Sequence, residues 1–310
     1  MTTPLPNTIT GRFAPSPTGL LHTGSLVAAV GSWLISKSMG GRWLLRIDDL
    51  DAPRLKPETV DHILQTLEAF NLFWDGEISW QSRHLQEYAA AFETLKQKGL
   101  VFPCDCSRKE IALAASAPHQ EDDCLTYPGT CRDGLRDDAV MRSWRIRVPD
   151  EEICFNDLRL GEICQNLTKT CGDIVLRRAD DVFSYQLAVV VDDYLTGVNQ
   201  VVRGDDLLSS TPRQIHIQQA LGLPQPAYCH LPLVTGHDGA KLSKRDNLVS
   251  VNPGNVQTDR NKLLFSILEF IGQQPPPELK GSDCSELLEW GIASFKTEQI
   301  PLKSGELKLL

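Results

Sequence analysis

Short and long apolar segments alternate at the start of the chain. Residues 9–13 read as a short strand, residues 43–47 are a short apolar run, and residues 26–35 between them form a longer, almost continuously apolar segment. Apolar runs of about four to eight residues are typical of buried strands, whereas longer runs favour a buried helix. The pattern therefore predicts a strand, a buried helix and a second strand, in that order.

Two amphipathic segments follow. Residues 57–70 begin with a proline, which helices accept in their first turn, and residues 82–98 begin with Ser82, a typical helix cap. Both segments are predicted to be helices, and the resulting order is typical of an α/β fold with a doubly wound parallel sheet. Ligands bind beyond the carboxyl ends of the strands in such sheets, so Asp48, directly after the second strand, is a candidate site residue.

Beyond residue 100 the regular alternation stops. Residues 101–180 combine several cysteines with short loops and β-like runs, which indicates an inserted subdomain. Strands and helices alternate again over residues 181–255, and residues 256–310 read as mainly helical. We therefore predict a domain split into residues 1–100 and 181–255, with the insert between its halves and a short helical C-terminal region.

Composition limits the classes of protein to which the chain can belong. Of its 310 residues, 41% are hydrophobic and 23% are charged, as in ordinary globular enzymes. The net charge of −9 argues against a general positive field, so a nucleic-acid partner would need local basic patches. The candidate patches, which also fit ordinary solvated surfaces, are Arg142, Arg145 and Arg147, the pair Arg177 and Arg178, and the loop 241–245.

Membrane and export signals do not stand out in the sequence. No run reaches about 18 apolar residues, and the start lacks the charged and apolar parts of a signal peptide. The nine cysteines are an odd number, which fits a reducing compartment in which most thiols pack as small apolar groups. We therefore expect a cytoplasmic protein with no membrane partner.

Two motifs far apart in the sequence suggest ATP chemistry. Residues 12–25 read Arg-Phe-Ala-Pro-Ser-Pro-Thr-Gly-Leu-Leu-His-Thr-Gly-Ser where the first strand passes into the helix, and residues 241–245 read Lys-Leu-Ser-Lys-Arg. Backbone N–H groups at a helix start, with a donating His22, can stabilise negative charge on the α-phosphate of ATP, and two lysines can follow the departing pyrophosphate. Each motif alone fits a helix cap or a surface loop, but together they predict an ATP site. The ATP-binding candidates are Thr18, His22, Gly24, Ser25 and Lys244, and the catalytic candidates are His22, Lys241 and Lys244.

The same motifs carry a family resemblance. Residues 12–24 resemble the first signature of class I glutamyl-tRNA synthetases and residues 241–245 resemble the second; residues 45–51, 185–197 and 201–214 also resemble that family, in collinear order. The resemblance implies the Rossmann fold of class I aminoacyl-tRNA synthetases. It also implies that ATP, with Mg²⁺, and L-glutamate are the substrates.

Glutamate presents two carboxylates and an ammonium, which two guanidiniums and one acid would complement. By resemblance, Arg12 and Arg203 hold carboxylate, and Asp48 receives the amino group. The family usually has glutamate in place of Asp48; the shorter side chain leaves the carboxylate about 1.5 Å back, a gap that a water can bridge. The implied glutamate-binding residues are Arg12, Ala14, Ser16, Asp48, Tyr185 and Arg203. The alternatives are surface charges at strand ends for the arginines and a plain core aromatic for Tyr185.

The insert contains a candidate metal site. Cys104 and Cys106 are followed by Cys131, and structural zinc sites need four ligands, usually thiolate or imidazole. Ligand softness favours Cys124 as the fourth ligand over Tyr127 or His119. Short glutamyl-tRNA synthetase relatives use Cys-x-Cys followed by Tyr-x-x-x-Cys, so the resemblance implies one structural Zn²⁺ held by Cys104, Cys106, Tyr127 and Cys131. The remaining cysteines are predicted to be packing residues: Cys154, Cys164, Cys171, Cys229 and Cys284.

Only 65 residues follow the second motif, too few for the anticodon-binding domain of full-length glutamyl-tRNA synthetases, and residues 24–29 read Gly-Ser-Leu-Val-Ala-Ala. Both features resemble a truncated paralogue within the family. The resemblance implies tRNA-independent formation of glutamyl-adenylate and transfer of glutamate to the cyclopentenediol of queuosine at position 34 of tRNA(Asp), with the anticodon stem-loop held by the insert, and a monomer is expected. The alternatives are a truncated glutamyl-tRNA synthetase that charges the 3′ end of tRNA, and a non-catalytic tRNA-binding regulatory protein.

Overall fold

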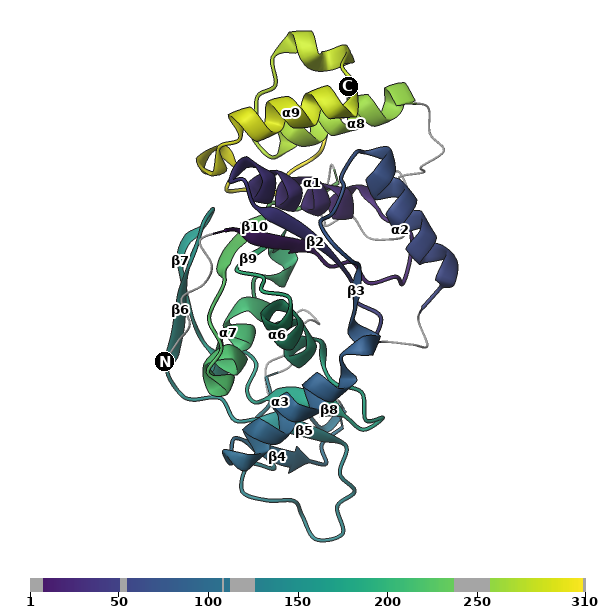
Figure 1. Cartoon of the computed structure of the whole chain (residues 1–310). Coiled ribbons are helices and arrows are strands. Elements are labelled where there is room, and N and C mark those ends of the chain that lie inside the picture. The colour runs from purple at the N-terminus through teal and green to yellow at the C-terminus, as the bar shows by residue number, and fades with distance from the viewer. Residues whose placement is uncertain (1–7, 51–54, 108, 112–125, 237–256, 309–310) are drawn as a thin grey trace.

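The computed structural model describes residues 8–50, 55–107, 109–111, 126–236 and 257–308. A twisted, mainly parallel sheet lies at the centre of the molecule (Figure 1). One part has the order β1–β2–β3, all parallel, and the other has the order β9–β10–β6–β7, in which only β7 runs antiparallel to its neighbour. The strands are β1 (Thr10–Phe13), β2 (Arg42–Ile47), β3 (Ser79–Trp80), β6 (Glu152–Asp157), β7 (Gly161–Asn166), β9 (Gln200–Gly204) and β10 (Ala227–Leu231).

The two parts of the sheet meet between β1 and β9. The backbone N–H of Asn199 donates to the Thr10 carbonyl at 3.0 Å, and the Thr10 N–H donates to the Asn199 side chain at 2.8 Å. Strand order reverses at this point, and doubly wound sheets bind ligands beyond the carboxyl ends of the strands there. The candidate site residues Arg12 and Arg203 come from these two strands.

Helices cover both faces of the sheet. On one face, α1 and α2 share an apolar core with α8 and α9, which lie above α1 in Figure 1. A methyl group on Gly291 of α9 would come within 2.8 Å of Leu34, so the absent side chain lets α9 approach α1 closely. On the other face, α3, α6 and α7 form a second core. The helices are α1 (Thr23–Ser38), α2 (Pro57–Ala69), α3 (Leu85–Gln97), α6 (Tyr185–Leu195), α7 (Ser210–Leu221), α8 (Gln257–Phe270) and α9 (Cys284–Ser294), with a short α5 (Leu167–Thr170).

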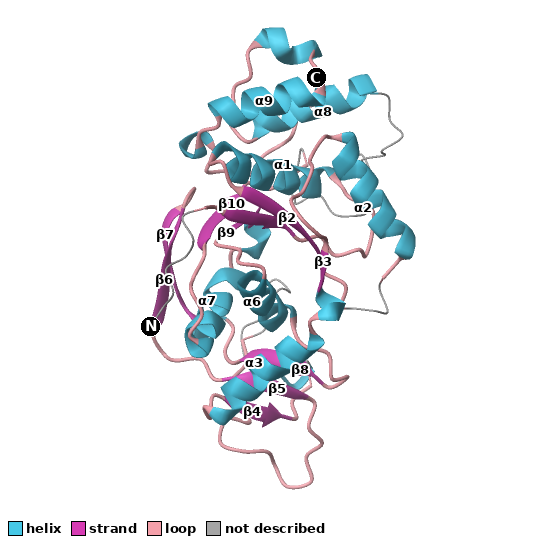
Figure 2. Ribbon diagram, in the orientation of Figure 1, coloured by secondary structure: helices cyan, strands magenta, loops and turns pink. Residues whose placement is uncertain are grey.

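A separate antiparallel sheet lies at the opposite end of the molecule from α8 and α9 (Figure 2). It consists of β4 (Val101–Cys104), β5 (Ser143–Ile146) and β8 (Ile174–Arg178). The β6–β7 hairpin, also between residues 101 and 180, instead joins the central sheet by pairing β6 with β10. The strands of the predicted insert therefore divide between two sheets, and its boundaries stay a prediction.

The predicted helix over 82–98 begins later than its cap residue suggested. Residues Gln81–Arg83 form a 3₁₀ turn and α3 starts at Leu85, so Ser82 does not cap it. Ser82 instead donates to the Asp49 carboxylate through its backbone N–H at 2.8 Å and its hydroxyl at 2.6 Å. A serine cap and a serine that binds a distant carboxylate look alike in sequence, because both precede an amphipathic segment.

The prediction that Cys154 and Cys164 are packing residues is wrong. They face each other across the β6–β7 hairpin as a disulfide, and both are exposed to solvent. Cys171, Cys229 and Cys284 are buried, as predicted. In the described part of the chain, no helix is both long and apolar enough to span a membrane.

Candidate active site

The loop between β1 and α1 ends at His22, which caps α1. The Ser25 N–H donates to His22 Nδ1 at 3.2 Å, and Ser25 Oγ lies 3.1 Å from His22 Nε2. Because Nδ1 accepts a bond, we assign the proton to Nε2, which makes that nitrogen the donor. A methyl group on Gly24 would come within 3.2 Å of the His22 ring, so the glycine leaves space for the imidazole. The first motif therefore combines a helix N-terminus with an oriented donor, a combination suited to binding phosphate.

Arg12 and Asp48 belong to one buried cluster of charges. Arg12 makes two bonds to Asp193 at 3.1 and 3.3 Å. Arg46, from β2, donates to Asp48 at 2.6 Å through Nε and to Asp193 at 2.7 Å through Nη1. Arg46 also lies 3.6 Å from Asp192, so three carboxylates face two guanidiniums in this cluster. An ammonium would balance the excess negative charge.

Burial and ion pairing act in opposite directions on these acids. Burial raises the pKa of Asp48 to about 6, although the bond from Arg46 partly opposes the rise. Burial also favours the neutral form of Asp193, but the ion pairs with Arg12 and Arg46 outweigh it and lower the pKa of that carboxyl. Both carboxyls are therefore ionised at neutral pH, and Asp48 is the acid closer to protonation.

Arg203 is held by a second buried network. Its Nη2 donates to Thr211 Oγ1 at 2.7 Å, and its Nε donates to His230 Nε2 at 3.3 Å. His230 Nδ1 in turn bonds to Asp157 at 2.7 Å. Burial lowers the pKa of His230 by more than the Asp157 carboxylate raises it, so the ring is neutral. Its proton lies on Nδ1, and Nε2 accepts the bond from Arg203.

One nitrogen of Arg203 has no partner among the described residues. Arg203 is 5% exposed, and its Nη1 is buried without a hydrogen bond. The other guanidinium nitrogens in this situation in the described chain are all Nε atoms. Since a buried donor without a partner is costly, Nη1 is the clearest candidate for a ligand contact.

The other predicted glutamate-binding residues lie nearer the surface. Ser16 is exposed and Ala14 is half-buried in the β1–α1 loop. Tyr185, the first residue of α6, is 37% exposed, which excludes the core role considered as an alternative. Lys241 and Lys244 lie outside the described residues.

The sequence reasoning missed the residues that hold the arginines in place. Arg46 and Asp193 sit inside stretches that resemble the family, but their pairing joins β2 to α6 and leaves no local signal. Asp157 and His230 likewise come from β6 and β10. Asp192 was missed too, although it is fully buried and accepts from Gln81 at 2.8 Å and from Tyr88 at 2.7 Å.

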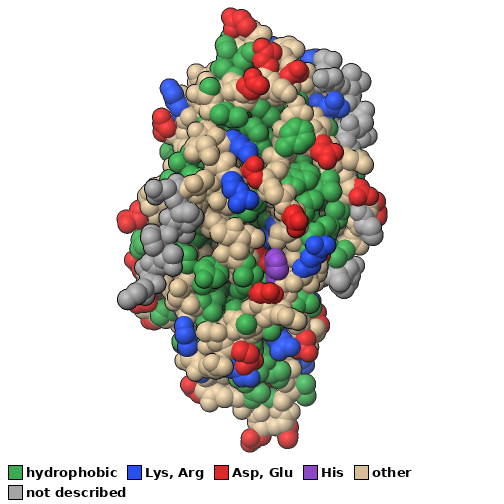
Figure 3. Space-filling model, in the orientation of Figure 1, with side chains coloured by type: hydrophobic (Ala, Val, Ile, Leu, Met, Phe, Trp, Pro, Cys, Tyr) green, Lys and Arg blue, Asp and Glu red, His purple; other side chains and the backbone are tan. Residues whose placement is uncertain are grey.

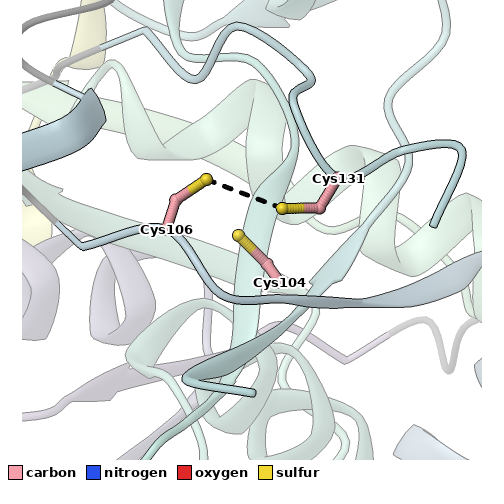
Figure 4. Close-up of side chains that lie close together, drawn as sticks. All are labelled: Cys104, Cys106 and Cys131. Carbon is pink, nitrogen blue, oxygen red and sulfur yellow. Dashed lines mark hydrogen bonds between the residues drawn. The ribbon is translucent and has the colours of Figure 1, made fainter. Parts of the chain in front are cut away.

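The three predicted cysteine ligands converge at one point (Figure 4). The Sγ atoms of Cys104, Cys106 and Cys131 all lie within 4.8 Å of one another. Tyr127 Oη lies 3.6 Å from Cys104 Sγ and accepts from the Cys131 N–H at 2.8 Å. The three thiols supply three ligands of the kind that tetrahedral zinc sites use, and the phenol lies beside them as the predicted fourth. The rival fourth ligands Cys124 and His119 lie outside the described residues.

The surroundings of the three thiols shift their pKa values in different directions. Burial, with the neighbouring thiols, raises the pKa of Cys106 to about 12, and burial with the bond to Asp105 raises the pKa of Cys131. Arg145 donates to Cys104 Sγ at 3.3 Å and, against the effect of burial, helps to lower the pKa of that thiol. A divalent cation would stabilise all three as thiolates.

Comparison with known proteins agrees with the fold. The family model for the catalytic domain of class I tRNA synthetases (E and Q) matches residues 8–284. A glutamate tRNA ligase from Elizabethkingia meningosepticum, solved in complex with its amino acid, has the same fold, with a TM-score of 0.80 at 22% identity over 98% of this chain and 68% of that one. The chain thus has the fold of the class I aminoacyl-tRNA synthetases and belongs to that class of ligases.

The curated relatives indicate a particular family within this class. The chain is 52% identical over 300 residues to the glutamyl-Q tRNA(Asp) synthetase of Geobacter sulfurreducens, covering 96% of this chain and 95% of the relative. It is 47% identical to the glutamyl-Q tRNA(Asp) synthetase of Thiobacillus denitrificans, covering 96% of each. The chain belongs to this family within the class I (E and Q) tRNA synthetases.

Proposed function

We propose that the protein activates L-glutamate with ATP and Mg²⁺, without tRNA, and transfers the glutamate to the cyclopentenediol of queuosine at position 34 of tRNA(Asp). The observation that carries the amino-acid part is the buried cluster at the reversal of strand order, which offers guanidiniums and an acid together. The names of relatives about half identical to the chain support the acceptor.

In this proposal, residues of the two buried networks bind the charged groups of glutamate. Arg203 receives a carboxylate on Nη1, the nitrogen without a partner. Arg12 receives the other carboxylate, and Asp48 receives the ammonium. Ala14, Ser16 and Tyr185 complete the pocket from its exposed side.

Activation then needs stabilisation of charge on the α-phosphate. A carboxylate oxygen of glutamate attacks the α-phosphorus, the bond to the bridging oxygen breaks, and pyrophosphate leaves with Mg²⁺. The Nε2–H of His22 and the N-terminus of α1 stabilise the charge that builds on the α-phosphate oxygens. Thr18, Gly24 and Ser25 bind ATP in the same loop, and Lys241 and Lys244 stabilise the pyrophosphate.

Transfer uses the same site with a different acceptor. One hydroxyl of the cyclopentenediol attacks the glutamyl carbonyl, the bond to AMP breaks, and an ester forms. The hydroxyl proton leaves with AMP, whose phosphate is a base supplied by the reaction itself. Lysines and arginines are mixed with acids on the face shown in Figure 3, which fits local rather than general contacts with tRNA.

The experiment that tests the acceptor uses tRNA pools with and without queuosine. Labelled glutamate is expected to attach only to the queuosine-containing pool. Attachment should also protect the cyclopentenediol from periodate, which cleaves free cis-diols. Label at the 3′ end of tRNA, or ATP–pyrophosphate exchange that strictly requires tRNA, would instead favour a truncated conventional glutamyl-tRNA synthetase.

We also propose that Cys104, Cys106, Tyr127 and Cys131 hold one structural Zn²⁺. Cys104→Ser is expected to lower the metal content from about one ion per chain to near zero and to destabilise the β4–β5–β8 region. Glutamyl-adenylate formation should keep most of its rate, because the cluster lies in a different sheet from the charged site. Metal analysis, thermal unfolding and ATP–pyrophosphate exchange measure the three effects.

Cys171→Ser is the matched control for the metal prediction. Cys171 is also buried, but its Sγ bonds to the Gly172 carbonyl at 3.3 Å and lies outside the cluster. This variant should retain the metal. Loss of adenylate formation in a folded Cys104→Ser protein would contradict a purely structural role.

The raised pKa of Asp48 predicts a pH dependence of glutamate binding. Asp48 is ionised above pH about 6 and protonated below it, so only the higher range supplies a carboxylate for the ammonium. The KM for glutamate should therefore rise about tenfold for each pH unit below 6, while the KM for ATP changes much less. ATP–pyrophosphate exchange at varied pH measures both constants. Asp48→Asn should bind glutamate weakly and lose this dependence; a variant that kept it would show that another group titrates.

A further inference from the structure

A pocket of about 380 Å³ is lined in part by the residues that directly follow Ser16 and Asp48, two proposed glutamate-binding residues. Its apolar lining comes from Pro17 in the β1–α1 loop, Leu55 and Val60 around the start of α2, and Trp80 at the end of β3. Its polar lining includes Asp49, which directly follows Asp48. The pocket thus lies beyond the carboxyl ends of β2 and β3, where the parallel sheet is expected to bind ligands.

The walls of the pocket are tied to the loop that carries the candidate ATP and glutamate residues. The Lys56 N–H donates to the Pro17 carbonyl at 3.3 Å, and the Asp48 N–H donates to the Pro15 carbonyl at 3.0 Å. Trp80 is in register with Ile47, the residue before Asp48. A group seated in the pocket would therefore lie close to the activated glutamate.

The aromatic wall favours a flat ring. Trp80 is half-buried, and together with Leu55 and Val60 it gives the pocket a mainly apolar surface. Bases stack on such side chains in many proteins that bind single-stranded nucleic acid. The guanidinium of Arg83 lies 5.8 Å from the centre of the Trp80 ring, so a positive charge is available for a flanking phosphate.

Asp49, one of the two acids that line the pocket, favours a guanine-like edge. Asp49 is fixed by two bonds from Ser82, one to each carboxylate oxygen, at 2.8 and 2.6 Å. Each oxygen keeps a second lone pair, so the carboxylate can accept two more bonds side by side. Guanine and 7-deazaguanine present two adjacent N–H donors on one edge, whereas the corresponding adenine edge places an acceptor beside its amino group.

We propose that this pocket seats the 7-deazaguanine base of the acceptor nucleotide, stacked on Trp80 with its N1–H and amino group on Asp49. This inference rests on the proposed function. Because the substituent at C7 lies on the opposite edge of the base, the cyclopentenediol is left free to reach the glutamyl carbonyl. An anticodon loop with unmodified guanine at position 34 would bind the same pocket and compete without reacting.

Trp80→Ala and Asp49→Asn test the pocket by separating transfer from activation. Each is expected to slow single-turnover transfer of glutamate to a queuosine-containing anticodon stem-loop by about 10- to 100-fold, the range that loss of a stacked base contact or of a hydrogen bond to a charged group produces. ATP–pyrophosphate exchange without tRNA should change little. Trp80→Phe should restore most of the transfer rate, and Asp49→Asn keeps an acceptor for Ser82, so neither result depends on unfolding.

Phe73→Ala is the matched control. Phe73 is an aromatic residue with 58% exposure that follows the other end of α2, so its removal should change neither transfer nor exchange. A rise in the KM for ATP in Trp80→Ala would show that the pocket holds the adenine of ATP and would overturn the proposal. Normal transfer in Trp80→Ala would overturn it equally.

A nucleoside-binding experiment tests the pocket independently of the proposed transfer of glutamate. Tryptophan fluorescence of the wild type and of Trp80→Phe is titrated with queuosine nucleoside, guanosine and adenosine. A Trp80-dependent response to queuosine and guanosine supports the pocket even if wild-type protein transfers glutamate to no tRNA, a result that would reject the proposed function alone. If neither nucleoside gives a response that depends on Trp80, the pocket is not a guanine-type site.

Discussion

His22→Asn is expected to slow glutamyl-adenylate formation by about 100- to 1,000-fold, the usual loss when one preorganised donor to a developing charge is removed. The bond from the Ser25 N–H to Nδ1 fixes the tautomer, so Nε2–H can donate to an α-phosphate oxygen in the transition state. Because this donation strengthens as charge builds, the KM for glutamate should stay nearly constant while kcat falls. Pre-steady-state adenylate formation measures the rate directly.

Asparagine is the informative replacement because it separates the cap from the donor. His22 caps α1, and its replacement by alanine would also cost about 0.5–2 kcal/mol of stability. Asparagine is among the best capping residues, so His22→Asn should keep the unfolding temperature close to that of the wild type. A normal kcat in His22→Asn would show that His22 only caps α1.

The order of strands and helices was predictable because local pattern determines it. The apolar run at residues 26–35 exceeds strand length, and it lies within α1. The short segments at 9–13 and 43–47, predicted to be strands, correspond to β1 and β2, which pair in parallel. Position at the end of a parallel strand then identified Asp48 as a site candidate without any knowledge of its partners.

The partners of these residues were not predictable, because they depend on contacts between distant segments. Arg46 reads in sequence as one more charge in a strand, yet it bridges Asp48 and Asp193. The Cys154–Cys164 pair depends on the register of a hairpin, which apolar patterning alone does not fix. Such pairings can be identified only from the folded structure.

The partners of Arg203 were likewise not predictable from the sequence, and its replacement is expected to have the second large effect. The resemblance suggested that it binds carboxylate, but only the structure places two of its nitrogens on Thr211 and His230 and leaves Nη1 buried without a described partner. Arg203→Ala is expected to raise the KM for glutamate by about 30-fold to several thousand-fold, the effect of losing about 2–5 kcal/mol from a buried charged contact. The KM for ATP should change little.

Arg203→Lys and Arg159→Lys test whether the guanidinium fork matters. Lysine keeps the charge but cannot bond to Thr211, His230 and a carboxylate at once, so Arg203→Lys should recover only a small part of the loss. Arg159 is also buried, but its two terminal nitrogens are paired with the Pro301 carbonyl at 3.2 Å and Asp205 at 2.8 Å. Arg159→Lys should therefore lower the unfolding temperature without a selective effect on glutamate. Equal losses of glutamate affinity in the two lysine variants would mean that Arg203 acts through stability and not through a contact with the substrate.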